Sequence, residues 1–213
     1  MKYLRDASQA EMILAFLRGE YDSARFGGEL RAAMRREGCA SEYLLDARLD
    51  DARQCDARRR VLAAYRGWGG AGLFERFPAR VRWQLARCEP GDLDAIRYIR
   101  YSYWDELTCW TGRARRAADS VCAGREVFGV SNAAFIAGAE RLRAGGQFAP
   151  LIALYSAAPR LVLLEGHSRL TAHALAPDRF AGALCYVGWC ARAALDAWAG
   201  PELRGEPDGY ATD

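Results

Sequence analysis

The chain has 213 residues, of which 51% are hydrophobic, and a formal net charge of +3. This length accommodates one full domain with a smaller accessory unit, and the composition suffices for a buried core. A net charge so close to zero gives no reason to expect a nucleic-acid partner. No apolar run approaches the ~20 residues of a membrane-spanning helix, and the seven cysteines include no C-x-x-C pair. We therefore expect a cytoplasmic protein with free thiols and without a membrane anchor or a zinc site.

The first 77 residues are predicted to form a helical unit. Ser8 and Glu11 have the spacing of a capping box, and the apolar residues that follow lie on one face of a helix. Two further helices are expected over residues 29–36 and 56–66, each ended by a glycine. The glycine-rich stretch after the last of them is typical of a domain boundary.

Residues 78–200 are predicted to form a small domain in which strands and helices are mixed. Strands are predicted over residues 80–87, 150–155, 160–164 and 183–187, and helices over 92–99, 111–122, 132–144, 168–175 and 189–198. An aromatic, arginine-containing insert covers about 101–125, and residues 201–213 are expected to be a flexible polar tail. The expected fold class is therefore α+β.

The segment 161–174 is predicted to be a strand, a tight turn and a helix. Gly166 allows the turn and lets a ligand approach without a Cβ in the way. Unpaired N–H groups and the helix dipole favour an anion at the start of such a helix. Arg169 can bind a phosphate through its planar guanidinium, and His167 and Ser168 add donors. The pattern predicts a phosphate site, although an ordinary strand–helix connection with a solvent-exposed arginine would look the same.

Four segments in order carry a resemblance to a known superfamily. They are a helix ending in glycine (RLRAGGQF), a strand after proline (PLIALY), a strand–turn–helix of the form aliphatic-acidic-Gly-x-x-Arg (LVLLEGHSRLTAHAL), and a short strand (GALCYV). Together with the strand at 80–87, they resemble the ParB/sulfiredoxin-like superfamily over roughly residues 79–190. The resemblance implies that the Gly-x-x-Arg turn wraps the phosphates of a nucleotide.

Departures from the superfamily pattern narrow what the resemblance implies. His167 stands where sulfiredoxins carry their nucleophilic cysteine, and almost no chain follows the fold where partitioning proteins have a helix-turn-helix domain. Neither of those activities is therefore expected. The acidic-Gly-His-x-Arg turn is most similar to that of the free serine kinases of this superfamily. The resemblance thus implies a nucleotide-dependent phosphotransferase, using ATP or another nucleotide with Mg²⁺, that acts on a small hydroxylated metabolite.

The phosphotransferase hypothesis gives a role to each of several residues. The nucleotide would be held by Gly166, His167, Ser168, Arg169 and Thr171. Glu165 and His167 would be catalytic, and Glu165 would also bind Mg²⁺. Glu106 is a further catalytic candidate, because a carboxylate among aromatic side chains can have a raised pKa. Structural roles remain open for three of them: Glu165 can tie down the turn, Glu106 can form a salt bridge, and Thr171 can bond back to its helix.

A different class of function is also compatible with the sequence. The chain could be a non-catalytic nucleotide-binding regulatory module whose N-terminal helices engage a protein or DNA partner. In either case the expected ligand is a nucleotide, and homo-oligomerisation remains open.

Overall fold

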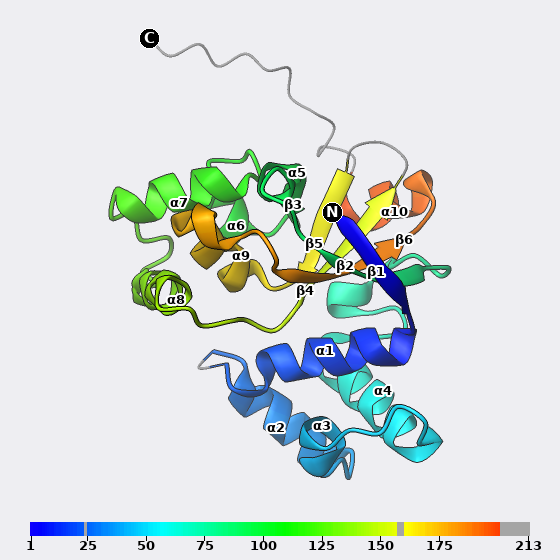
Figure 1. Ribbon diagram of the computed structural model, residues 1–213. Coiled ribbons are helices and arrows are strands. Elements are labelled where there is room, and N and C mark those ends of the chain that lie inside the picture. Colours follow the sequence, from blue (N-terminus) through cyan, green and yellow to red (C-terminus); the bar gives the residue numbers. More distant parts are fainter. Residues whose placement is uncertain (24, 157–159, 201–213) are drawn as a thin grey trace.

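The structure is a computed structural model that describes residues 1–23, 25–156 and 160–200. The elements in chain order are β1 (Lys2–Ala7), α1 (Gln9–Tyr21), α2 (Gly27–Arg36), α3 (Glu42–Leu45), α4 (Ala52–Arg66), η1 (Gly72–Phe74), β2 (Arg82–Arg87), α5 (Asp92–Ala95), β3 (Ile96–Tyr98), α6 (Ser102–Leu107), α7 (Ala114–Cys122), α8 (Ala133–Arg143), β4 (Leu151–Ser156), β5 (Arg160–Glu165), α9 (His167–Leu175), η2 (Pro177–Arg179), β6 (Leu184–Trp189) and α10 (Arg192–Ala199) (Figure 1). This mixture of helices and strands confirms the α+β class. The predicted connection at 157–159 and the predicted tail at 201–213 lie outside the described residues.

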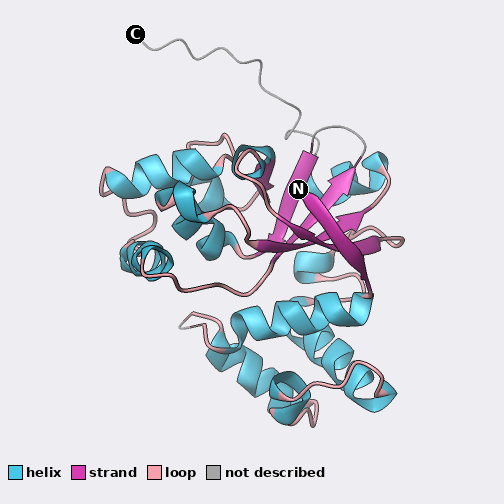
Figure 2. Cartoon of the chain, viewed as in Figure 1, coloured by secondary structure: helices cyan, strands magenta, loops and turns pink. Residues whose placement is uncertain are grey.

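Within the described residues, six strands form one mixed sheet in the order β1-β2-β6-β4-β5-β3 (Figure 2). β4 runs antiparallel to β5 and parallel to β6, and β3 runs parallel to β5. Successive residues of β4 point to opposite faces, so that Leu151 and Ala153 enter one core while Ile152 and Leu154 enter the other. A strand buried on both faces reads as a continuous apolar run, which is why β4 was predictable.

Helices cover both faces of the sheet. Phe16 of α1 and Val61 of α4 share one core with Val162 of β5, and Val121 of α7 and Leu170 of α9 belong to the other core. Figure 1 shows α1–α4 gathered on one side of the sheet and α6–α9 on the other. None of the helices in the described ranges combines the length and the apolar character that crossing a bilayer requires.

The N-terminal segment differs from the helical unit predicted for residues 1–77. Lys2–Ala7 is a strand that pairs antiparallel with β2, where Lys2 lies opposite Arg87. Its side chains are mostly exposed, so the segment lacks the apolar alternation that usually marks a strand. Its partner lies about 80 residues further along the chain, and only that long-range pairing makes it a strand.

The helix predicted over residues 92–99 is wrong in its second half. α5 covers only Asp92–Ala95, and Ile96–Tyr98 forms β3. Ile96 lies opposite Leu161 in the parallel pairing with β5. A β-branched and an aromatic residue at alternate positions suit a strand, and the sheet edge at β5 decides between two patterns that are locally similar.

Several element boundaries also differ from the prediction. α4 begins at Ala52, four residues before the predicted start, because Asp51 caps it by accepting a hydrogen bond from the Gln54 N–H. α8 has Asn132 rather than Ser131 as its N-cap. Trp189 belongs to β6 rather than to the last helix. Capping residues and strand ends are the least certain parts of a pattern-based prediction, because they depend on single side chains.

The capping box predicted at the start of α1 is confirmed. Ser8 Oγ accepts from the Glu11 N–H at 3.1 Å, and Glu11 Oε2 accepts from the Ser8 N–H at 2.8 Å. We expect Ser8→Ala to lower the free energy of unfolding by about 1 kcal/mol, because it leaves a helix N–H group without its acceptor. Urea unfolding measures the change. Ser8→Asp, which can still cap, should lose much less, and an equal loss in both variants would contradict this role.

Candidate functional site

The predicted turn lies between β5 and α9. Gly166 is the N-cap of α9 and has a φ of 104°, a left-handed conformation that other residues rarely adopt. A Cβ at this position would also lie 2.6 Å from Leu151 Cδ2. Both facts require glycine here. Ser168, in the first turn of α9, is exposed to solvent.

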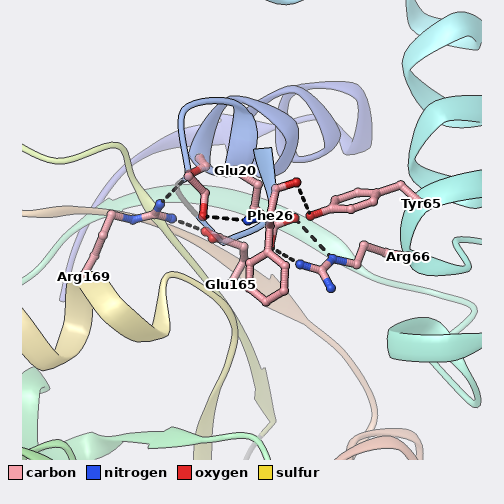
Figure 3. Close-up of polar contacts among 8 residues, drawn as sticks. Glu20, Phe26, Tyr65, Arg66, Glu165 and Arg169 are labelled. Atoms are coloured by element: carbon pink, nitrogen blue, oxygen red, sulfur yellow. Dashed lines mark hydrogen bonds and ion pairs between the residues drawn. The ribbon is translucent and has the colours of Figure 1, made fainter. Parts of the chain in front are cut away.

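Arg169 is directed away from solvent and toward Glu165. Its Nη2 forms an ion pair with Glu165 Oε2, and the two side chains are only 12% and 10% exposed (Figure 3). The guanidinium also donates to the carbonyl oxygens of Gly19 and Pro150, each at 3.3 Å. A Cβ at Gly19 would lie 2.9 Å from Arg169 Nη1. Arg169 is thus enclosed by α1 and joins the turn to the α1–α4 side of the sheet.

A second acidic–basic pair lies beside the first. Arg66 at the end of α4 donates to Glu20, from Nη2 to Oε1 at 2.6 Å and from Nε to Oε2 at 3.2 Å. The Arg66 guanidinium lies over the rings of Phe26 and Tyr65, at 4.2 and 4.4 Å from their centroids. In Figure 3, Tyr65 and Arg66 reach toward this region from α4. The pair holds α1 and α4 together next to the turn.

Glu20 was not among the predicted site residues, although its position in the sequence carried one signal. Glu20 lies in the last turn of α1, where the helix dipole disfavours a negative charge. Glu20 is only 7% exposed. A buried carboxylate in that position needs a cation from another element, and Arg66 provides it.

His167 lies in an aromatic stack with one ring from the predicted insert and one from β3. Its ring is 5.0 Å from that of Trp104 and 5.5 Å from that of Tyr98, with interplanar angles of 20° in both cases. Its Nε2 is enclosed and has no hydrogen-bond partner among the described residues. Burial lowers the pKa of His167 to about 3, and the positive charges of Arg169 and Arg66 contribute to this. The imidazole is therefore neutral near pH 7.

Glu165 differs from an ordinary surface glutamate in its pKa. Burial raises this pKa, the Arg169 guanidinium opposes the rise, and the nearby Glu20 carboxylate adds to it. Desolvation favours the neutral carboxyl, so the group has a greater affinity for a proton than a glutamate in water. A carboxylate with these properties is suited to accepting a proton from a hydroxyl group.

The remaining predicted residues occupy different surroundings. Thr171 is fully buried, donates to the His167 carbonyl oxygen at 3.0 Å, and lies 2.9 Å from the Tyr98 hydroxyl. Its proton is therefore already engaged within the fold. Glu106 is partly exposed and forms an ion pair with Arg125 at 2.7 Å. The structure thus brings Trp104 of the insert to the turn, while Glu106 is paired within the insert.

The described residues contain no group of three or more His, Cys, Asp or Glu side chains that could hold a metal ion. Comparisons with protein-family models, with curated proteins and with solved structures give no match to this chain.

Proposed function

We propose that this protein is a nucleotide-dependent phosphotransferase of the cytoplasm that acts on a small hydroxylated metabolite. The fold would be a variant of the ParB/sulfiredoxin-like type, as the motif order suggests. The single observation that carries the proposal is the buried Glu165 carboxylate, which has a raised pKa and lies directly before a glycine turn and the start of a helix. A proton acceptor next to an anion-favouring helix start is what phosphoryl transfer requires.

In this mechanism the phosphates lie at the N-terminus of α9. The N–H groups of the first turn and the Ser168 hydroxyl donate to them, and the neutral His167 fixes the shape of the site. Arg169 would exchange its Glu165 partner for a phosphate oxygen, because a phosphate accepts the same bidentate contacts. That exchange leaves the Glu165 carboxylate free. It then takes the proton of the acceptor hydroxyl. The hydroxyl oxygen bonds to the terminal phosphorus, and the bond from that phosphorus to the leaving nucleotide, now one phosphate shorter, breaks.

Mg²⁺ does not have a preformed site among the described residues, since Glu165 is already paired with Arg169. An ion that accompanies a nucleotide is commonly held by phosphate oxygens and water with one or two carboxylates. We therefore assign no step to it.

Substitution of Ser168 tests nucleotide binding without disturbing the core, because its side chain is exposed. Ser168→Glu adds a negative charge where the phosphates would lie, and that charge is itself favourable for the helix. Ser168→Gln is the matched neutral control. We expect millimolar ATP, ADP or CTP to raise the melting temperature of the wild type and of Ser168→Gln but not of Ser168→Glu. At a concentration about 100 times Kd the stabilisation is about 2.7 kcal/mol.

Two results would contradict nucleotide binding at this turn. One is the absence of a thermal shift with any of the three nucleotides in the wild type. The other is an equal shift in the glutamate and glutamine variants, which would move the binding site elsewhere.

Glu165→Gln tests the transfer step separately. The amide keeps a hydrogen-bond acceptor for Arg169 but cannot take a proton. Nucleotide should be consumed only in the presence of a hydroxylated acceptor, and Glu165→Gln should bind nucleotide but lose turnover. Retained turnover in this variant would rule out Glu165 as the base.

A second candidate function is supported by the Arg169–Gly19 contact. A ligand that withdraws Arg169 from the Gly19 carbonyl would release the turn from α1, so binding alone would alter the α1–α4 surface. Such a regulatory module would bind nucleotide, change its association with a protein or DNA partner, and consume no nucleotide with any acceptor. The same turnover assay, combined with measurement of the association state, distinguishes the two functions.

A further inference from the structure

A second region of interest is a cavity that lies further along α9, beside its C-terminal half at His173. Its volume is about 550 Å³, within the range of small-molecule sites. The end of α8 with its following loop forms one wall, and the segment from η2 to the start of β6 forms another. The lining residues used below are Arg87, Leu142, Phe148, Leu151, His173 and Arg179.

His173 is the polar residue at the inner end of this cavity. It is 4% exposed and lies edge-on between the rings of Phe148 and Phe180, at 5.6 and 5.3 Å. Its Nδ1 is enclosed and has no hydrogen-bond partner among the described residues. A buried imidazole with no bonded partner favours a ligand that supplies one.

Burial lowers the pKa of His173 to about 4, so the ring is neutral near pH 7 and brings no charge to the cavity. The charge at the cavity comes from its rim. Arg179 pairs with Asp178 at 3.2 Å. Within the described chain, the exposed side chain of Arg87 has no ion-pair partner. The rim therefore has one uncompensated positive charge, and the walls of Leu142, Phe148 and Leu151 are apolar.

We propose that this cavity binds a small organic monoanion, a carboxylate with an apolar or aromatic body. Arg87 binds the carboxylate at the rim, the body packs against Leu142 and Phe148, and the imidazole of His173 bonds a polar atom of the ligand where one is present. None of residues 165–169 lines this cavity, and the proposal does not depend on the function proposed for that turn.

Benzoate is the test probe, with benzamide as its uncharged match. Binding is followed in the full-length chain by two-dimensional amide NMR, with Gly145, Gly146 and Gly182 as reporters because they line the cavity. We expect saturable millimolar binding of benzoate and binding of benzamide that is at least about tenfold weaker, since a charge-assisted contact is lost.

Two variants on one strand make the test specific. Arg87→Gln should weaken benzoate binding at least about tenfold. Arg82→Gln, at the other end of β2 and exposed, should leave it unchanged, because Arg82 does not line this cavity. Both substitutions are on the surface, so folding is preserved. Equal effects of the two variants, equal binding of benzoate and benzamide, or no saturable shift of the glycine reporters would each overturn the proposal.

Discussion

Replacing Arg169 with alanine should lower the free energy of unfolding by about 3–5 kcal/mol at pH 7. The substitution leaves the Glu165 carboxylate buried without its cation, and it removes the contacts with the Gly19 and Pro150 carbonyl oxygens. Loss of one member of a buried pair is far more costly than loss of a surface pair. Denaturant unfolding followed by circular dichroism measures the change.

Arg179→Ala is the matched control for this prediction. Arg179 also pairs with a carboxylate, that of Asp178, but the two side chains are 50% and 70% exposed. Its loss should cost no more than about 1 kcal/mol. In the double variant Glu165→Leu/Arg169→Met, much of the loss should be recovered, because no charge is left buried. A loss in Arg169→Ala as small as that of the control would mean that the pair is solvated in solution.

The second large effect is acid sensitivity from the two buried histidines. The pKa values of His167 and His173 are lowered to about 3 and about 4. The unfolded chain, with pKa values near 6.5, binds protons first as the pH falls. The contribution to stability is therefore fully present above pH 6.5 and is lost below it. From pH 6.5 to 4.5 we expect a loss of about 2.5 kcal/mol for each histidine.

His173→Phe separates the contributions, because it keeps an aromatic ring between Phe148 and Phe180 but cannot take a proton. The slope of unfolding free energy against pH between 6.5 and 4.5 should be smaller in this variant by up to ~1.4 kcal/mol per pH unit, the contribution of one histidine. Glu165 acts in the opposite direction, since its pKa is raised and the folded state retains its proton better. Comparison of the variant with the wild type cancels that contribution. An unchanged slope would show that His173 is accessible to protons in the folded state.

The parts of the fold that were predictable are those that short stretches of sequence determine. The capping box at Ser8, the left-handed glycine at the end of α4, and the strand–Gly–helix at 160–175 each depend on residues a few positions apart. The parts that were missed depend on distant partners. β1 is a strand because of β2, and β3 is a strand because of β5.

The same distinction holds for the candidate site. Gly166 and its turn were identified from the sequence, but the surroundings of the turn were not. The pairing of Arg169 with Glu165 does not follow from helix spacing, because Glu165 ends β5 and lies outside α9. The Gly19 carbonyl comes from a helix 150 residues away in the chain. The stack of His167 on Trp104 likewise joins two segments that share no local pattern.

The Gly19–Arg169 contact has a consequence for the order in which the molecule assembles. Because its two residues are 150 positions apart, the loop that it closes includes most of the chain. Contacts of such high sequence separation form late and slow the folding of a domain. The α1–α4 helices can associate with one another early. The charged pairs Glu20–Arg66 and Glu165–Arg169 come together only when α9 packs against α1. A ligand that binds at this turn would therefore require both sides of the sheet to be folded.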